Sequence, residues 1–569
     1  MKKVLALLLA VVMLFGLVAC GSGTASETEN PAEKPAETIE EYHGEMPLVK
    51  PGEEPVTITI GLVTNANVTD YKDNAYTKWL EEQTGLNLEF VQFTSAADAA
   101  KLVSLQVASG EKLPDILWHM DSITKQMGED YGRDGYFAPL SDYFEHYAHY
   151  FTESFLEAYD GDPEPLRRIL RRAAGADNQP IYCFPNETAH ALSRPQAQPW
   201  VNQQWLDKLG LEQPTTIEEL YDVLVAFRDQ DPNGNGKKDE IPLIGKTYGT
   251  WAAPDPLNWI LNAFTYYNDK IYYRVQDGKL DVPFKSEEYR DGLKFVNKLV
   301  AEGLMSPLTW TQSAEELKSL VNPNEGQDFV VGIFCGNSPS IFNQGNDSLR
   351  VYEPLKPLKD HTGQGGYSII ATGHAMQTYI SADCERPDLA FKLLDLTCSQ
   401  ESYLRQRYGE YGVDWVYSEG GKPGNRGGEA KIKLINPNAF YEQNNSSWHA
   451  LGSVYSELDW QYEVDQSDPE NWDTLYVNKL NKMYQQAVDA PHMEEEFDFA
   501  IYSVSDYAER ADFARDLISY IYNRRSQFCT GELDPHSDSD WQTYMEGLDA
   551  LQYDRWVELA QMGYDRIFE

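Results

Sequence analysis

Between residues 55 and 118 the sequence alternates between strand-like and helix-like segments. The stretch "PVTITIGLV" alternates apolar and threonine side chains as a half-buried strand does, and "LNLEFVQF" and "DILWH" are further strands. Between them, "AYTKWLEEQTG" and "SAADAAKLVSLQVASG" are typical of helices that stop at Gly85 and Gly110. This β-α-β-α-β order predicts a parallel sheet with helices on its faces, and therefore an α/β fold.

Polar and aromatic side chains follow two of these predicted strands. Asn65 and Asn67 come after the first strand, and Trp118 and Asp121 lie at the end of the third. Ligands of open α/β sheets collect at the carboxyl ends of the strands. We therefore expect these four residues to contact a ligand.

The composition limits both the architecture and the partners. A chain of 569 residues is too long for one compact core, so two large lobes are expected. The hydrophobic content of 42% is enough to form a core in each lobe. The formal net charge of −43 would repel phosphate backbones. We therefore expect that the protein does not bind nucleic acid.

The N-terminus predicts export. "MKK" is a short basic segment, the following apolar run is about 15 residues and thus short for a membrane-spanning helix, and "LVAC" resembles a bacterial lipobox ending in Cys20. An ordinary secretory signal is the alternative. Residues 21–54 are rich in Gly, Ser, Thr, Glu and Pro and predict a disordered tether. We expect a signal peptide over residues 1–20 and an extracytoplasmic protein held at the cell membrane by lipid on Cys20.

The remaining motifs give little sign of catalysis. Five cysteines follow Cys20 without a C-x-x-C pair, which favours buried thiols over zinc or a dense disulfide framework. "EIPLIGKT" ends like a phosphate-binding loop but has Glu240 where the first glycine belongs. H-E-x-x-H and G-x-S-x-G are absent. No spacing singles out a serine triad or a pair of catalytic carboxylates, so we expect no enzymatic activity.

A second helix and strand pattern begins near Trp200. "WLDKLGL" predicts a short helix, and "TIEELYDVLVAF" predicts a longer one that opens with a capping box of Thr216 and Glu219. "SEEYRDGLKFVNKLVAEGL" predicts another helix, which stops at Gly303, and residues 328–334 predict a buried strand.

The stretch "DPNGNGKKDE" follows the second of these helices and has the spacing of a calcium loop. An EF-hand-type loop takes oxygen ligands from positions 1, 3, 5, 7 and 9 and needs glycine at position 6. Those positions hold, in order, Asp231, Asn233, Asn235, the Lys237 carbonyl and Asp239, with Gly236 at the turn. Pro242 replaces the usual glutamate at position 12, and Glu240 could supply that carboxylate if the loop closes earlier. The alternative is a polar surface loop with two Asn-Gly turns.

The segment from "WLDKLGL" to "DEIPL" resembles the family 1 extracellular solute-binding lipoproteins of ABC transporters, in particular the alginate-oligosaccharide-binding and LipO-like group. "LPDIL", "KLVAEGLMSP", "ERPDLAFKLLDL" and "RYGEYGVDW" are further similar pieces. The resemblance implies a structural Ca²⁺ ion and selects Glu240 as its sixth ligand, beside the five loop positions already named. It also implies a two-lobed, periplasmic-binding-protein-like (type II) fold with a ligand cleft between the lobes.

The implied lobes are discontinuous in sequence. Lobe 1 is expected over residues 55–195 and about 355–425, and lobe 2 over about 196–354 and 426–569. The implied function is capture of an oligosaccharide for an ABC transporter permease by a protein expected to be a monomer.

Aromatic residues are candidates for sugar contacts because they offer flat apolar faces with polar edges. Beside Trp118, we expect Trp251, Trp259 and Trp415 to serve this role, and packing in the core is the alternative for each. Relatives commonly carry a basic residue ahead of the tryptophan in "QPWVNQQWLDKLGL", and this chain does not, so a neutral sugar is favoured over alginate. A surface glycan-degrading enzyme and a peptide-binding lipoprotein of the same architecture are the competing hypotheses.

Overall fold

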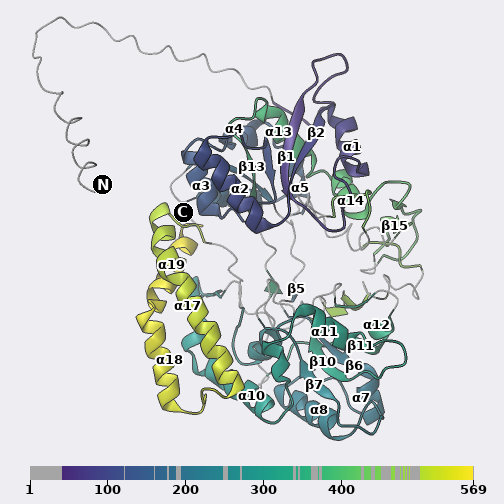
Figure 1. Cartoon of the computed structure of the whole chain (residues 1–569), viewed down its shortest axis with the longest axis vertical. Coiled ribbons are helices and arrows are strands. Elements are labelled where there is room, and N and C mark those ends of the chain that lie inside the picture. Colours follow the sequence, from purple (N-terminus) through teal and green to yellow (C-terminus); the bar gives the residue numbers. More distant parts are fainter. Residues whose placement is uncertain are drawn as a thin grey trace, which may run out of the picture. The chain divides into compact units, whose positions relative to one another are not determined.

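The computed structural model places residues Tyr42–Glu569 in one compact unit (Figure 1). The structure describes residues 41–567, except for 121, 159–160, 176–178, 187–193, 196, 248–253, 269–271, 337–340, 344–345, 360–368, 371–374, 425–427, 437–442, 450–462, 468–474, 476–477, 481, 484–485 and 487–499. The predicted signal peptide, Cys20 and most of the predicted tether lie outside the described residues.

The first sheet, here called sheet A, confirms the predicted β-α-β-α-β order. Its strands follow the order β2-β1-β3-β13-β4, and their bounds are β1 Thr57–Val63, β2 Asn87–Phe93, β3 Ile116–Trp118, β13 Ala375–Ile380 and β4 Cys183–Asn186. Strand β1 pairs in parallel with both β2 and β3, as Ile60 shows by its register with Phe90 and Ile116. The helices between them are α1 (Ala75–Thr84) and α2 (Ala96–Ser109).

Both helices begin and end where the sequence predicts. The side chains of Asn74 and Ser95 accept hydrogen bonds from the first-turn amides of α1 and α2. Gly85 and Gly110 end the two helices in the left-handed conformation, with φ of 72° and 70°. Glycine adopts this conformation without the steric cost that a Cβ atom brings.

Strand β13 runs antiparallel to both of its neighbours, β3 and β4, which the local pattern did not predict. Strand β4 therefore runs in the same direction as β1 and β3. As a result, the carboxyl ends of β1, β3 and β4 and the start of β13 share one edge of sheet A. We call it the carboxyl edge.

A second sheet, sheet E, has the strand order β11-β6-β10-β7, with bounds β11 Tyr352–Pro354, β6 Pro199–Asn202, β10 Val331–Cys335 and β7 Ile241–Ile244. Strand β10 lies within and just beyond the predicted range of 328–334. Ile333 lies in register with Val201 and Leu243, and all three are fully buried in one core. The neighbouring row of Phe334, Trp200 and Ile244 is buried in a different core. Sheet E is thus covered on both faces.

The chain passes from sheet A to sheet E after β4 and returns before β13. On the way out it forms β5 (Arg194–Pro195), and on the way back β12 (Ile369–Ile370). These two short strands pair with each other antiparallel, Ile369 opposite Pro195 and Ile370 opposite Arg194. The two connections are therefore tied together by main-chain hydrogen bonds at the point where the chain changes sheets.

Helices surround each sheet. Those that follow the first-sheet strands are α3 Lys125–Arg133, α4 Ser141–His146, α5 His149–Ala158, α6 Glu164–Ala174, α13 Pro387–Leu396 and α14 Gln400–Tyr408. Those near the second sheet are α7 Gln203–Leu209, α8 Ile217–Asp229, α9 Leu257–Ile260, α10 Glu287–Ala301, α11 Ala314–Val321 and α12 Ser348–Val351. The part of the chain that the structure describes also contains short 3₁₀ turns and two-stranded sheets. They are η1 Leu261–Ala263, η2 Pro283–Lys285, η3 Pro307–Trp310, β8 Arg274–Gln276 with β9 Lys279–Asp281, and β14 Trp415–Tyr417 with β15 Ile432–Leu434.

The start of α8 differs in detail from the predicted capping box. The Thr216 side chain caps the helix by accepting from the Glu219 amide at 3.1 Å, as expected. The Glu219 carboxylate, however, accepts from the backbone and hydroxyl of Thr215, each at 2.8 Å. Thr215 offers the Glu219 carboxylate two donors at once, whereas the Thr216 backbone would offer one, and this explains the change of partner.

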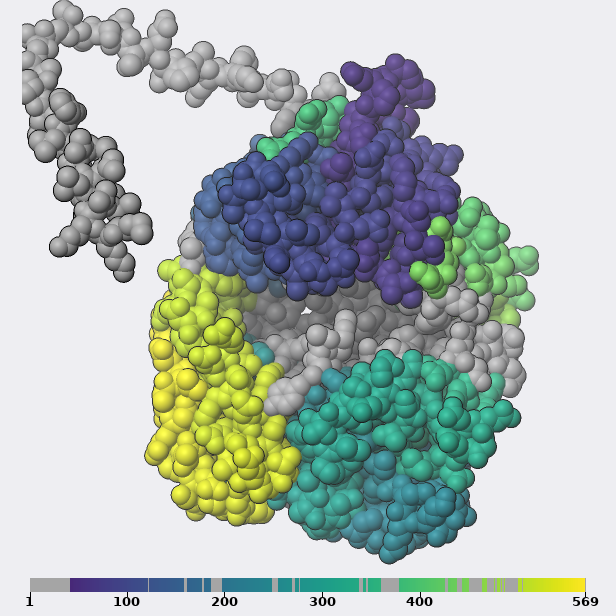
Figure 2. All heavy atoms as spheres, viewed as in Figure 1, coloured from purple at the N-terminus to yellow at the C-terminus, as the bar shows by residue number. Residues whose placement is uncertain are grey.

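The C-terminal helices α17 (Val504–Thr530), α18 (Asp538–Ala550) and α19 (Tyr553–Asp565) form a layer of their own, yellow in Figures 1 and 2. Their buried side chains, such as Leu517 and Trp556, belong to the same core as Leu243 of sheet E. Among the described residues, no helix combines the length and apolarity needed to cross a bilayer.

The five cysteines after Cys20 are buried thiols, which confirms the prediction. They are Cys183, Cys335, Cys384, Cys398 and Cys529. Burial raises the pKa of each thiol above its ordinary value, because the thiolate would lose its hydration.

One fully buried carboxylate connects two helices around sheet A. Asp395 on α13 accepts hydrogen bonds from the Phe151 amide at 2.9 Å and the Tyr150 amide at 3.1 Å, in the first turn of α5. It therefore caps a helix from a distant part of the chain. Burial raises the pKa of Asp395 to about 7 from its ordinary value of 3.8, although the two amides oppose this shift.

We predict that Asp395→Asn changes how stability depends on pH. Because the folded-state pKa is raised, the stabilising contribution of protonated Asp395 is complete below about pH 4 and is lost as pH rises through 7. The neutral amide cannot titrate, so the advantage of the native protein over the variant should be larger at pH 5 than at pH 8. Urea unfolding at both pH values measures it.

The exposed Asp142→Asn is the control, and its unfolding free energy should follow the native curve at both pH values. Parallel curves for the native protein and Asp395→Asn would show that Asp395 is already ionised when the protein is folded.

Candidate ligand site and metal loop

The carboxyl edge of sheet A brings together several of the predicted ligand residues. Asn65 and Asn67 lie in the turn after β1, and Trp118 is the last residue of β3. Strands β1 and β3 are hydrogen-bonded neighbours, and Leu62 of β1 is in register with Trp118. The parallel pairing therefore places the turn and Trp118 at the same edge, as predicted. Asp121 lies outside the described residues.

The turn after β1 is held by its own polar groups. The Asn65 amide donates to the Tyr71 hydroxyl at 3.0 Å, and the Asn65 side-chain oxygen accepts from the Asn67 amide at 2.9 Å. Asn65 is thus used to shape the turn. The half-buried side chain of Asn67 has no hydrogen-bond partner within the part of the chain that the structure describes. Its amide group is therefore available to a ligand.

A segment from far along the sequence, residues 444–449, also lies at this edge. The Asn444 amide donates to the Asn67 carbonyl at 2.9 Å, and the Thr69 amide donates to the Asn444 carbonyl at 3.0 Å. The Asn74 side chain donates to the Ser447 carbonyl at 2.9 Å. Its hydrogen bonds thus attach this segment, which was predicted to belong to lobe 2, to the turn after β1. The exact lobe boundaries stay a prediction.

Trp448 in this segment is the residue that sequence reasoning missed. It is fully buried, its indole N–H donates to the Thr77 hydroxyl at 2.9 Å, and its ring meets that of Trp118 edge to face with centroids 5.5 Å apart. One signal could have found it. The dipeptide Trp-His occurs at 118–119 and again at 448–449.

Two other predicted aromatic residues have packing partners for both their rings and their polar groups. Trp259 is 2% exposed within the core of sheet E and donates to the Lys356 carbonyl at 3.0 Å. Trp415 is 0% exposed in a small separate core and donates to the Gly409 carbonyl at 3.0 Å. This geometry favours the packing alternative for both. Trp251 lies outside the described residues.

The predicted calcium loop follows α8, as expected. Both carboxylate oxygens of Asp231 accept backbone amides, one from Gly234 at 3.0 Å and the other from Gly236 at 3.1 Å. Asp231 has a φ of 49° and Gly236 a φ of 74°, so the loop makes two sharp turns. The amide nitrogens of Asn233 and Asn235 donate to the Asp239 carboxylate at 2.9 to 3.2 Å.

These contacts determine the electrostatics of the loop. The amide donated by Asn233 holds the pKa of Asp239 below its ordinary value. Burial, with Asp239 and Asp231 nearby, raises the pKa of Glu240, and one of its carboxylate oxygens is buried without a hydrogen-bond partner. No group of three or more His, Cys, Asp or Glu side chains suited to a metal occurs among the described residues.

The donor set fits a hard cation. Ca²⁺ prefers oxygen ligands, and this loop carries carboxylate, side-chain amide and main-chain carbonyl oxygens close together. The side-chain amides of Asn233 and Asn235 exchange oxygen for nitrogen by a half-turn about the last side-chain bond, which would direct oxygen at a cation. The unpartnered oxygen of Glu240 is the observation that most favours a ligand here.

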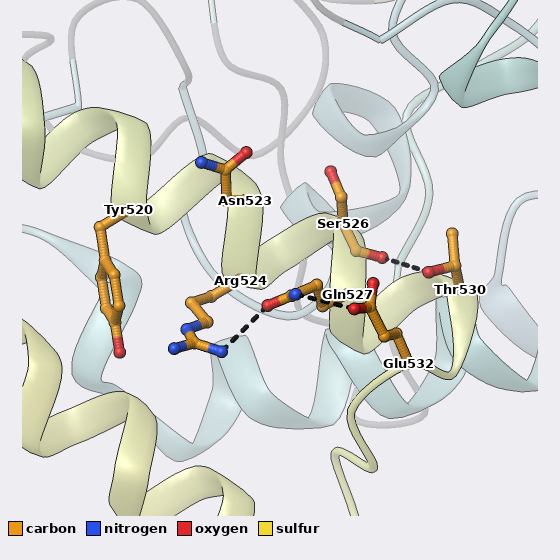
Figure 3. A pocket seen from close by; sticks show the side chains of 7 residues that line it. All are labelled: Tyr520, Asn523, Arg524, Ser526, Gln527, Thr530 and Glu532. Carbon is orange, nitrogen blue, oxygen red and sulfur yellow. Dashed lines mark hydrogen bonds between the residues drawn. The ribbon is translucent and has the colours of Figure 1, made fainter.

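A surface hollow of about 510 Å³ lies on the C-terminal part of α17 (Figure 3). Arg524 donates to Gln527 at 3.0 Å, and Gln527 donates to Glu532 at 3.1 Å. The Tyr520 ring stacks on Tyr544 with centroids 6.0 Å apart. The side chains that could bind a ligand are thus engaged with one another, and the hollow does not resemble a sugar site. Its lining consists of Tyr520, Asn523, Arg524, Ser526, Gln527, Thr530 and Glu532.

Sequence comparison relates the chain to bacterial binding proteins along most of its length. It is 24% identical over 505 residues, 86% of each chain, to the fructooligosaccharide ABC transporter substrate-binding protein FusA of Streptococcus pneumoniae serotype 4 (strain ATCC BAA-334 / TIGR4). The fold is also similar to that of FusA in complex with kestose, with a TM-score of 0.69 and 20% sequence identity. The superposition covers 90% of this chain and 99% of FusA. In sequence and in fold the chain is thus similar to substrate-binding proteins of ABC transporters.

Two further relatives come from Bacillus subtilis (strain 168). The chain is 26% identical over 231 residues to the polygalacturonan/rhamnogalacturonan-binding protein YtcQ, and the match covers 38% of this chain and 43% of YtcQ. It is 35% identical over 106 residues to the lipoprotein LipO, and this match covers 19% of this chain and 20% of LipO. No protein-family model matches the chain.

Other solved structures confirm the predicted fold class. The HMO-binding solute-binding protein of Bifidobacterium longum infantis ATCC 15697 has a TM-score of 0.70 at 19% identity, over 90% of this chain and 99% of that one. The alginate-binding protein AlgQ2, described without calcium ion, has a TM-score of 0.61 at 19% identity, over 90% and 98%. One of the FusA structures is an EF-hand mutant in complex with fructo-nystose.

The relatives are binding proteins and not enzymes, in agreement with the prediction of no enzymatic activity. FusA and YtcQ are named for the sugars that they bind and not for a reaction. The hypothesis of a glycan-degrading enzyme is thereby set aside.

Proposed function

We propose that this solute-binding protein captures a neutral oligosaccharide in a cleft between its two lobes and delivers it to the permease of an ABC importer. The observation that carries the proposal is the similarity to FusA over 86% of both chains. The carboxyl edge of sheet A supports it, because the side-chain amide of Asn67 can both donate a hydrogen bond to a sugar hydroxyl and accept one from it. The paired connections β5 and β12 supply the hinge that closure around a ligand requires.

The charge of the protein supports a neutral ligand. The relatives differ in this respect, since FusA is named for fructooligosaccharides and YtcQ for polygalacturonan and rhamnogalacturonan, which contain acidic sugars. Uronic acids need cationic partners for their carboxylates. A chain with a formal charge of −43 repels such ligands at long range.

We predict that the purified mature protein binds neutral oligosaccharides on a glycan array, and that Asn67→Ala weakens binding of the best of them about five- to tenfold in isothermal titration. The loss corresponds to about one hydrogen bond of 1 to 1.5 kcal/mol. Asn324→Ala, at an exposed position near sheet E, is the matched control and should bind as the native protein does. Binding only to acidic glycans, or only to peptides, would contradict the proposal.

We also propose that the loop from Asp231 to Glu240 binds a structural Ca²⁺ ion. The ligands would be oxygens of Asp231, Asn233, Asn235, Asp239 and Glu240 and the Lys237 carbonyl. The Lys208 ammonium donates to the Asp231 and Pro232 carbonyls, so the loop is also anchored to α7. The proposed ion would screen three carboxylates from one another and stabilise this lobe without taking part in sugar binding.

The corresponding prediction is a calcium-dependent melting temperature. Calcium at a hundredfold its dissociation constant should add about 2.7 kcal/mol to the free energy of unfolding, because only the folded loop binds it. Chelation should therefore lower the melting temperature. The double variant Asp231→Ala with Asp239→Ala should have lost this response and should still bind sugar at low temperature.

Asp512→Ala, an exposed substitution on α17, should respond to chelation as the native protein does. If calcium has no effect on the native melting temperature, the stretch is a pair of Asn-Gly turns.

Finally, we propose that lipid on Cys20 anchors the protein to the outer face of the cell membrane. The lipobox-like "LVAC" supports this, and so does the relative named lipoprotein LipO. Cys20→Ser should move the protein from the membrane fraction to the soluble fraction with an unchanged circular dichroism spectrum, because the modified residue lies outside the folded lobes. Ser22→Ala should stay with the membrane. Membrane retention of Cys20→Ser would refute the anchor.

A further inference from the structure

Trp118 combines complete burial with an unused hydrogen-bond donor. Its side chain is 0% exposed at the end of β3, and its indole N–H has no partner among the described residues. Leaving a buried donor unpaired costs about 1 to 3 kcal/mol. The neighbouring Trp448, at the same edge, has its N–H bonded to Thr77.

Trp118 differs in position from the other buried tryptophans with an unpaired N–H. Trp200 lies within β6 and Trp556 within α19, each inside a core of sheet E. Trp118 also belongs to a core, that of sheet A, but it is the last residue of β3 and so lies at the carboxyl edge, where α/β sheets bind ligands. What distinguishes this unpaired donor from the other two is therefore its place at the strand end, not a lack of core packing.

The backbone at this edge is strained in two matching places. His119 has a φ of 53° and His449 a φ of 50°, and each directly follows one tryptophan of the Trp118–Trp448 pair. A residue with a Cβ atom pays about 1 kcal/mol or more for this left-handed conformation. The His119 amide donates to the Thr378 hydroxyl on β13 at 3.2 Å, and the His449 amide donates to the Ser447 hydroxyl at 3.2 Å. The surrounding structure thus maintains both turns.

We propose that the indole N–H of Trp118 is a hydrogen-bond donor reserved for the oligosaccharide, and that the Trp448 ring and the turn at His119 position it. The proposal rests on the proposed function and names a specificity determinant within the same site. The acceptor is a hydroxyl or ring oxygen of the sugar, because an N–H donor needs an oxygen lone pair, and the neutral class of the sugar is taken from the proposed function. Since the N–H is covered in this structure, sugar binding must displace the side chains over it, which couples binding to a local rearrangement.

Trp118→Phe tests this proposal because it removes the N–H and keeps an aromatic ring. The sugar used is the neutral oligosaccharide that the native protein binds best. We expect its affinity to fall about five- to tenfold by isothermal titration, while the melting temperature of the ligand-free protein changes no more than in the matched control. The control is Trp556→Phe, which alters another buried tryptophan with an unpaired N–H and should bind sugar as the native protein does.

A second variant separates the donor from the shape of the ring. Benzothienylalanine at position 118 replaces the N–H by sulfur and preserves the bicyclic outline, so the fold is retained even if Trp118→Phe unfolds the protein. The same loss of affinity is expected. Sugar affinity equal to that of the native protein in this variant would overturn the proposal and show a packing role for Trp118. The proposed function fails separately, if the native protein itself binds no neutral sugar.

Discussion

The antiparallel course of β13 is the constraint on which the arrangement of the site depends. Because β13 enters sheet A between β3 and β4 from the opposite direction, the chain both leaves and re-enters this sheet at the carboxyl edge. The outgoing and returning connections and the turns after β1 and β3 therefore all start from one edge of sheet A. A parallel β13 would begin at the other edge, and the two connections could not pair.

The strands and helices at the start of the first lobe could be predicted from local sequence patterns, whereas the later segments that complete sheet A could not. The strands and helices from Thr57 to Trp118 have strong periodicity and clear stop signals at Gly85 and Gly110, and each forms where expected. The resemblance, and not a local pattern, assigns the range of β13 to lobe 1, and it assigns the segment around Trp448, which also packs against sheet A, to lobe 2. Their pairing depends on tertiary contacts, which short-range patterns do not encode.

The candidate site shows the same division. The loop after α8 could be located because a metal loop fixes residue types at fixed intervals, and Asn67 could be located because it follows a strand. The roles of the tryptophans could not be separated, since residue type does not distinguish a buried ring from one facing a ligand. All three of Trp118, Trp259 and Trp415 lie in cores, but the N–H groups of Trp259 and Trp415 are hydrogen-bonded and that of Trp118 is not. Only the hydrogen-bond partners show this difference.

The burial of the thiols has a consequence for a protein that is exported, as the N-terminus predicts. Oxidants and other thiols react with an exposed thiolate, and each of the five cysteines is both covered and held in its protonated form by burial. A chain exported in the unfolded state would gain this protection simply by folding. Maturation would then need no disulfide isomerase, and the folded protein would keep the same covalent structure in air-exposed and oxygen-free surroundings alike.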